Sequence, residues 1–406
     1  MKNVFIIDDY ASSQTNGIGT YIKELMFCLK VMKMNICHIA CCYDSEVFMI
    51  KMNDEIKQMQ FPAIPYFFVT HYTIIDKFLR LYIKDTVENV FLFSHTPCDF
   101  LVKKVKSSFP LSKLIFVIHD MVWTESMFGD KLKIKKYSAS ENNALFEKEY
   151  PKMFLRFKEE KRMYETVNRI VALTPETVEL LQSAYNSNSQ KISLIPNSLR
   201  DTYSSISGKE KVHLKKNYFI PLNEKIIVFV GRVSNAKGIY QVINSLKKTI
   251  KTYPNFRLVI LGTILEVKKI MEHAGEIASK ITFTGQIPKE RLYEWYQIAD
   301  IGVLASYSEQ CNFTGIEMMM HGLPVVASDG FGVGEMFKDG VNAKIARIGD
   351  RNHLEEFENN LSEAFLELLQ SPDLCKKLGE NGRRIYESQY HINNMKEGYR
   401  MLLDSL

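Results

Sequence analysis

The stretch at residues 308–328, SEQCNFTGIEMMMHGLPVVAS, reads as a loop, a helix, a second loop and a buried strand. Glu309 and Glu317 bracket the point at which the first loop becomes the helix. A helix start offers unpaired backbone N–H groups and the positive end of the helix dipole to an anion. The amides concerned are those of Phe313, Thr314 and Gly315. The two carboxylates can accept hydrogen bonds from vicinal hydroxyls, so the stretch predicts a site for a phosphorylated polyol. Glutamates at this spacing also occur on solvated helix faces, and the rest of the chain has to decide between the two readings.

Short β-branched apolar runs alternate with amphipathic helical stretches over nearly all of the 406 residues. This pattern is typical of parallel sheets flanked by helices, and 46% hydrophobic residues can fill two cores. The expected strands lie at 4–7, 36–42, 90–93, 114–118, 170–173 and 192–195, then at 226–230, 258–261, 281–284, 302–304 and 325–327. We therefore expect an α/β protein with two doubly wound domains, residues 1–198 and residues 199–390. Ligands of such sheets bind at the carboxyl ends of the strands, so a cleft between the halves is the expected site.

Composition excludes several classes of function. The seven cysteines are odd in number and several lie in apolar runs, which favours a reducing, cytoplasmic location without disulfides or a metal site. No apolar stretch approaches the length of a membrane span, and we expect no secretory signal. The net charge of +5 carries no nucleic-acid-binding signature. A basic region at 103–162 is either a solvated helical surface or a contact for an anionic membrane.

A second motif follows the apolar run at 226–230. It begins with Gly231 and Arg232 and ends with Lys237 and Gly238, just before a predicted helix. Arg232 can bind phosphate oxygens in bidentate fashion and Lys237 can add a point charge, so the pair can neutralise a diphosphate leaving group. Two solvated loop cations would give the same pattern.

The first half offers less specific candidates. Gly17 and Gly19 follow the first predicted strand, but Ile22 stands where a dinucleotide fingerprint needs its third glycine. They form either a substrate loop or a plain helix start. His119 follows a buried strand, where catalytic groups of doubly wound folds collect, and His95 has the same placement. Either histidine can equally be structural. The chain has no nucleophile elbow, no Walker loop and no Asp-x-Asp metal motif.

Taken together, these motifs resemble the retaining GT-B glycosyltransferases of the family 4 group, the glycosyl transferases group 1. The resemblance rests on the Gly231-Arg232 and Lys237-Gly238 motif, the Glu309/Glu317 pair and the stretch HGLPVVA at 321–327. Further agreement extends over most of the chain, at Gly17-Ile-Gly19, His119-Asp120, Ala172-Leu-Thr174, Ile195-Pro-Asn197, Phe283-Thr-Gly285 and Tyr296-Gln-Ile-Ala-Asp300. The resemblance implies two Rossmann-like domains facing a central cleft, with a C-terminal helix at about 391–406 returning to the first domain.

The resemblance also implies roles for the site residues. Arg232 and Lys237 would bind the diphosphate of a nucleoside diphosphate sugar, Glu317 its ribose and Glu309 the transferred sugar. His119 would contact that sugar near the reacting centre. The implied reaction uses no cofactor and no metal. It also needs no protein base, because the departing phosphate accepts the proton of the hydroxyl acceptor.

The chain departs from the family pattern in two places that bear on the site. Gly17 and Gly19 would shape a loop near the donor phosphates, but Asn16 replaces the first glycine of the usual Gly-Gly-x-Gly. Glu309-Gln-Cys-Asn-Phe replaces the usual Glu-Gly-Phe-Gly, which leaves the donor sugar open. A sugar-nucleotide epimerase of the same architecture and a non-catalytic partner subunit are the alternatives. Retention of Arg232 and Lys237 argues against both.

Overall fold

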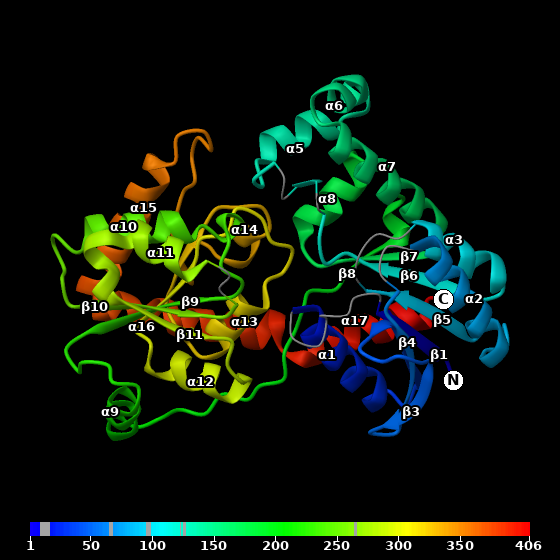
Figure 1. Ribbon diagram of the computed structural model, residues 1–406, viewed down its shortest axis with the longest axis horizontal. Helices are drawn as coiled ribbons and strands as arrows, with labels where there is room; N and C mark the ends of the chain where they lie inside the picture. The colour runs from blue at the N-terminus through cyan, green and yellow to red at the C-terminus, as the bar shows by residue number, and fades with distance from the viewer. Residues whose placement is uncertain (9–16, 65–67, 95–98, 122, 125–126, 264–265) are drawn as a thin grey trace. The chain divides into compact units, whose positions relative to one another are not determined.

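The computed structural model describes all residues except 9–16, 65–67, 95–98, 122, 125–126 and 264–265. The chain forms two compact units, traced by colour in Figure 1. The first comprises Met1–Ser126, Lys131–Arg200 and Ile392–Leu406, and the second comprises Met127–Asp130 and Asp201–His391. Each unit is built on one largely parallel sheet with helices, which confirms the predicted α/β fold class. Within the described residues, no helix is long and apolar enough to cross a membrane.

The first unit contains an eight-stranded sheet with the order β3-β4-β2-β1-β5-β6-β7-β8. Its strands are β1 (Asn3–Asp8), β2 (Asn35–Tyr43), β3 (Met49–Asn53), β4 (Ile56–Pro62), β5 (Asn89–Phe93), β6 (Lys113–Val117), β7 (Arg169–Ala172) and β8 (Ile192–Leu194). All pairings are parallel except that between β3 and β4. Every residue of the inner strand β5 is buried, as expected for a parallel strand covered on both faces.

The antiparallel hairpin of β3 and β4 was not predicted. Its turn consists of Asp54 and Glu55, which both have positive φ, 47° and 67°. A two-residue turn with φ positive at both positions matches the twist of a hairpin, but asparagine and glycine are its usual residues. The edge strand β3 is exposed from Ile50 onward, and Lys51 and Asn53 interrupt its apolar residues. Neither the usual residue pair of this turn nor a continuous apolar run therefore indicated the hairpin.

The helices of the first unit include the C-terminal segment of the chain. They are α1 (Gly17–Val31), α2 (Phe68–Tyr82), α3 (Asp99–Ser108), α5 (Lys131–Ser138), α6 (Asn143–Glu149), α7 (Pro151–Thr166), α8 (Pro175–Ser183) and α17 (Ile392–Asp404). Helices α1 and α17 lie side by side (Figure 1), and the buried hydroxyls of Tyr21 and Tyr399 are hydrogen-bonded between them. The last helix therefore belongs to the core of the first unit.

The second unit contains a parallel six-stranded sheet with the order β11-β10-β9-β12-β13-β14. Its strands are β9 (Lys225–Val230), β10 (Phe256–Leu261), β11 (Ile281–Gly285), β12 (Ile301–Leu304), β13 (Val325–Ser328) and β14 (Ala343–Ala346). The sequence predicted all of these except β14, which has four residues and includes Lys344. The order reverses where β9 pairs with β12, so the loops after these two strands lead in opposite directions. In open α/β sheets this switch point is where ligands bind.

The helices of the second unit cover this sheet. They are α9 (Gly208–Asn217), α10 (Ile239–Thr249), α11 (Val267–Ala274), α12 (Lys289–Ile298), α13 (Phe313–Met320), α14 (Val333–Met336), α15 (Glu355–Gln370) and α16 (Pro372–Ile385). Helix α13 is an inner helix, because every residue from Gly315 to Met320 is buried. Its glutamate Glu317 is therefore a buried charge, not part of a solvated face.

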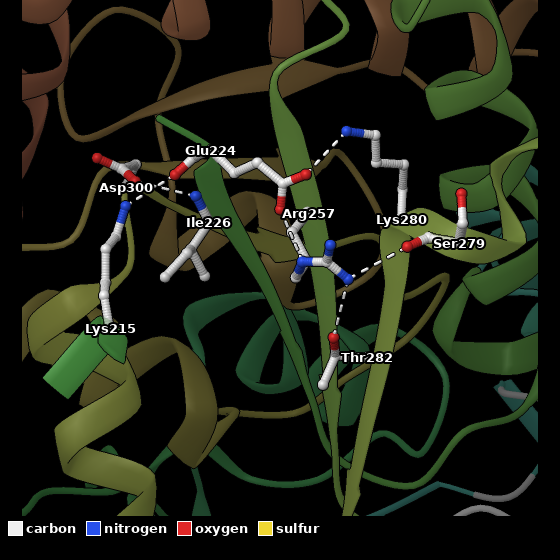
Figure 2. Close-up of polar contacts among 8 residues, drawn as sticks. All are labelled: Lys215, Glu224, Ile226, Arg257, Ser279, Lys280, Thr282 and Asp300. Atoms are coloured by element: carbon white, nitrogen blue, oxygen red, sulfur yellow. Dashed lines mark hydrogen bonds and ion pairs between the residues drawn. The ribbon is translucent and has the colours of Figure 1, made fainter. Parts of the chain in front are cut away.

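The amino ends of the strands are joined by charged side chains (Figure 2). The buried carboxylate of Glu224 accepts hydrogen bonds from Arg257 Nε at 2.7 Å and Lys280 Nζ at 2.8 Å. Lys215 Nζ donates to the backbone oxygen of Glu224 at 2.7 Å, and Arg257 also donates to Thr282 Oγ1 at 3.3 Å. These charges link the starts of β9, β10 and β11 to one another. They stabilise the sheet at the edge opposite the motif loops.

Candidate functional site

The loops after β9 and β12 are held together through their backbones. The amide of Tyr307 donates to the carbonyl oxygen of Ala236 at 3.0 Å. Gly238 has φ +71°, and a Cβ at that position would lie 2.3 Å from the carbonyl oxygen of Ala305. Only glycine combines this conformation with so close an approach. The two predicted motifs therefore meet at the switch point of the second sheet.

Lys237 and Glu309 form an ion pair between these loops. Lys237 Nζ donates to Glu309 Oε1, and the residues are 72 positions apart in the sequence. Both side chains are largely buried, with 24% and 12% of their surfaces exposed. The amide of Glu309 donates to the carbonyl oxygen of Phe331 at 2.9 Å, which fixes the loop that carries the carboxylate. The structure thus brings together two residues that the sequence placed in separate motifs.

Arg232 extends from the turn that follows β9. Gly231 has φ +130°, and its amide donates to the carbonyl oxygen of Leu261 at 2.9 Å. The side chain of Arg232 is exposed, and no hydrogen bond or ion pair joins its guanidinium to another residue in the described part of the chain. Arg232 is therefore an exposed cation in the same loop as Lys237. Its guanidinium is available to an anionic ligand.

The start of α13 differs in one respect from the prediction. The side chain of Asn312 caps the helix, and its Oδ1 accepts the amide hydrogen of Gly315 at 3.1 Å. Of the three amides expected to receive an anion, that of Gly315 thus already has a partner, whereas Phe313 and Thr314 form the half-buried first turn. A Cβ on Gly315 would lie 3.0 Å from the ring of Phe337, so this glycine also permits close packing. Asparagine is a preferred N-cap residue, and this signal was present in the sequence.

Glu317 is held by α12. Its carboxylate pairs with Lys289 Nζ at 3.2 Å and accepts a hydrogen bond from the Tyr296 hydroxyl at 3.1 Å. Burial raises the pKa of Glu317. The charge and hydrogen bond of Lys289 and the hydrogen bond of Tyr296 oppose this rise only in part. Sequence reasoning missed Lys289 as a site residue. The signal was the helical spacing of Lys289, Tyr293 and Tyr296, which places them on one face.

His119 belongs to the first unit and follows β6. It is half-buried, and its ring lies edge-on to the ring of Tyr21, with centroids 4.3 Å apart and an interplanar angle of 70°. Tyr21 is in turn bonded to Tyr399 of the C-terminal helix. The imidazole is therefore positioned by two helices that come from opposite ends of the chain.

The glycine pair near the start forms the first turn of α1. The helix begins at Gly17, and Gly19 is buried. The described residues therefore favour a helix start, one of the two readings of this motif. The alternative histidine, His95, lies outside the described residues, as does the segment 9–16.

Two hollows lie near the amino ends of β12 and β13. Their volumes are about 220 and 320 Å³, and both are lined by Tyr203, His321 and Gly322. His321 Nδ1 bonds to the carbonyl oxygen of Glu317 at 2.8 Å, and burial lowers the pKa of His321 to about 4. The imidazole is therefore neutral at physiological pH. Among the described residues, no group of three or more His, Cys, Asp or Glu side chains could hold a metal ion.

Residues 211–385 match the family described as "Glycosyl transferases group 1". An uncharacterized glycosyltransferase of Methanocaldococcus jannaschii is 27% identical over 178 residues, which are 43% of this chain and 45% of that protein. A D-inositol 3-phosphate glycosyltransferase of Nocardia farcinica is 26% identical over 250 residues, 57% of this chain and 55% of that protein. The chain thus spans about half the length of the curated relatives it matches.

Solved structures match the fold over the full chain. Sucrose-phosphate synthase from Thermosynechococcus elongatus has a TM-score of 0.78 at 16% identity, with both chains covered completely. HepE from Anabaena, solved in complex with UDP and glucose, has a TM-score of 0.74 at 13% identity and the same coverage. At such identities the likeness concerns the fold, and these folds are GT-B. Residues 211–385 therefore match the family model of the glycosyl transferases group 1, and the chain as a whole has the GT-B fold.

Proposed function

We propose that the protein transfers a hexosyl unit from a nucleoside diphosphate sugar to a hydroxyl acceptor with retention of configuration. The observation that carries the proposal is the ion pair of Lys237 and Glu309 at the switch point of the second sheet. The diphosphate would lie against Arg232 and Lys237, the ribose against Glu317 and the sugar hydroxyls against Glu309. HepE, a structural neighbour, was solved with UDP and glucose, which makes a uridine nucleotide the first donor to test.

In the proposed reaction the bond between the anomeric carbon and the diphosphate breaks, and negative charge grows on the departing phosphate oxygens. Arg232 and Lys237 would stabilise this charge. Lys237 would exchange its present partner Glu309 for the diphosphate, which frees the carboxylate of Glu309 to accept hydrogen bonds from the sugar. The acceptor hydroxyl would attack from the same face and give its proton to the departing phosphate. Neither a metal nor a protein base takes part, and His119 would contact the transferred sugar.

The acceptor in this proposal is a glycan, a lipid-linked saccharide, or a protein or peptide. We further propose a cytoplasmic location with peripheral contact to an anionic membrane through the basic region. Helix α5 supports this contact, because it carries four lysines and exposes 82% of the Leu132 surface. Helix α7 exposes 61% of Leu155. Sedimentation with phosphatidylglycerol vesicles but not with phosphatidylcholine vesicles is expected, and equal sedimentation with both would contradict an electrostatic contact.

A panel of nucleotide sugars followed by NMR tests the proposed reaction. We expect one donor to lose its nucleoside diphosphate slowly in the absence of acceptor, with the anomeric configuration retained in the first sugar released. Lys237→Ala should abolish this release while its thermal unfolding stays close to that of the unaltered protein. Formation of an isomeric sugar nucleotide would identify an epimerase instead. No change in any donor would contradict enzymatic turnover of nucleotide sugars.

A further inference from the structure

The buried carboxylate of Glu317 has one partner for each oxygen. Oε1 pairs with Lys289 Nζ at 3.2 Å, and Oε2 accepts from the Tyr296 hydroxyl at 3.1 Å. Only 7% of the Glu317 side chain is exposed, whereas 38% of Lys289 is exposed. A carboxylate has about four acceptor positions, so each oxygen keeps one for a further donor. Two vicinal hydroxyls would fill both.

Lys289 is the counter-charge of Glu317. From α12, Lys289, Tyr293 and Tyr296 face the region, and Lys289 Nζ lies 5.8 Å from the centre of the Tyr293 ring. At the end of α13, His321 bonds to the backbone of Glu317 and is neutral, because burial lowers its pKa to about 4. Within the described residues, the ion pair of Glu317 is therefore made with Lys289 alone.

We propose that Lys289 is a positioning residue for the donor: with the Tyr296 hydroxyl it aims the Glu317 carboxylate at the two hydroxyls of the donor ribose and balances its charge. The inference rests on the proposed function, in which Glu317 binds the ribose. A buried carboxylate without a counter-charge takes up a proton, and a protonated carboxyl can no longer accept from two hydroxyls with both oxygens. Removal of Lys289 should therefore weaken donor binding in a pH-dependent way.

Three variants of α12 test this role. Lys289→Met removes the charge, Lys289→Arg keeps it, and Arg291→Met removes a cation of the same helix that pairs with Glu294 at 2.9 Å. Calorimetry with UDP, GDP and ADP at roughly pH 6, 7 and 8 gives the Kd of the nucleotide that binds. Lys289→Met should bind it about tenfold more weakly at the lowest pH and approach the unaltered protein at the highest, since the carboxyl ionises as the pH rises. Lys289→Arg and Arg291→Met should follow the unaltered protein throughout.

The outcomes separate this inference from the proposed function. If the unaltered protein binds a nucleoside diphosphate and Lys289→Met shows the same affinity, or the same loss at every pH, the positioning role is overturned while the proposed function stands. If Arg291→Met shows the same pH-dependent loss, the effect belongs to the helix and not to Lys289. If the unaltered protein binds none of the three nucleotides, the proposed function and this inference are both overturned.

Discussion

Replacing Glu160 by glutamine should make the first unit more stable, and increasingly so as the pH rises. Glu160 lies on α7 and is completely buried, and its carboxyl accepts hydrogen bonds from Trp123 Nε1 at 3.1 Å and from the Tyr185 hydroxyl. Burial raises the pKa of Glu160 to about 8, although both hydrogen bonds lower it. Glutamine keeps an acceptor oxygen for the two donors and carries no charge to be desolvated. The substitution therefore removes the titrating carboxyl of Glu160 and keeps the packing of its side chain.

The size of the effect follows from the two pKa values. The pKa of an unfolded glutamate is near 4.5, so the folded protein holds its proton more tightly. The stabilisation from this group is complete below about pH 4.5 and is lost as the pH rises through 8. One pKa unit is worth about 1.4 kcal/mol, so the loss approaches about 3 kcal/mol at pH 7 and about 5 kcal/mol above pH 8. For a unit of this size, the midpoint of thermal unfolding changes by about 2–4 °C per kcal/mol.

Thermal unfolding followed by the fluorescence of Trp123 measures this effect. The chain has two tryptophans, one in each unit, so a Trp295→Phe background confines the signal to the first unit. We expect the midpoint of Glu160→Gln to exceed that of the parent by an amount that grows between roughly pH 5 and pH 8. Glu159→Gln, on the same helix but partly exposed, is the control and should show no such growth. A difference between variant and parent that is equal at every pH would refute the reasoning.

The remaining predictions concern the second unit. Lys237→Ala and Glu309→Ala should each reduce transfer by about 10²–10³-fold or more while the protein still folds, as steady-state kinetics and calorimetry can check. Near-normal turnover in either would contradict their roles. Gly238→Ala should weaken nucleotide binding and destabilise the unit, because the added Cβ would lie 2.3 Å from a carbonyl oxygen of the neighbouring loop. Gly340→Ala is the control, because Gly340 has φ +66° and nothing lies within 4 Å of the new Cβ. It should show only the backbone strain of about 1 kcal/mol. Equal losses of nucleotide binding in Gly238→Ala and Gly340→Ala would contradict the close approach at Gly238 as the cause. Arg257→Met should destabilise the unit by about 1–3 kcal/mol in urea unfolding, because Glu224 loses one charged partner and keeps Lys280, while nucleotide affinity stays unchanged. An unaltered stability would contradict the role of the charges in Figure 2.

Much of the fold could be predicted because its central strands are buried on both faces. Continuous apolar runs such as 226–230 are the direct consequence of that burial, and the glycine turns after them indicated where the strands end. The edge strands could not be predicted in this way. Strand β3 is exposed along most of its length, and the two central residues of β14, Lys344 and Ile345, are only half-buried, so neither strand needs an apolar run. Each of them pairs with a single strand, β3 with β4 and β14 with β13, at one edge of its sheet.

The candidate site, like the fold, could be predicted only in part from the sequence. The motif residues Arg232, Lys237, Glu309 and Glu317 could be proposed as site residues from residue type and spacing within single loops and helices. The pairing of Glu317 with Lys289 could not, because it depends on how α12 packs against α13. The cap of Asn312 on Gly315 is local, but it competes with the expected anion for the same amide, and the sequence does not indicate which partner holds it.

Hydrogen exchange in the presence of a nucleoside diphosphate would locate the donor site directly. With UDP, GDP or ADP added to the full chain, we predict slower amide exchange in the loops at 231–238 and 305–312 and in the first two turns of α13, and Lys237→Ala should remove this protection. Protection confined to the hollows beside Tyr203 and His321, or to the first unit, would contradict the assignment of the donor site to the carboxyl ends of β9 and β12.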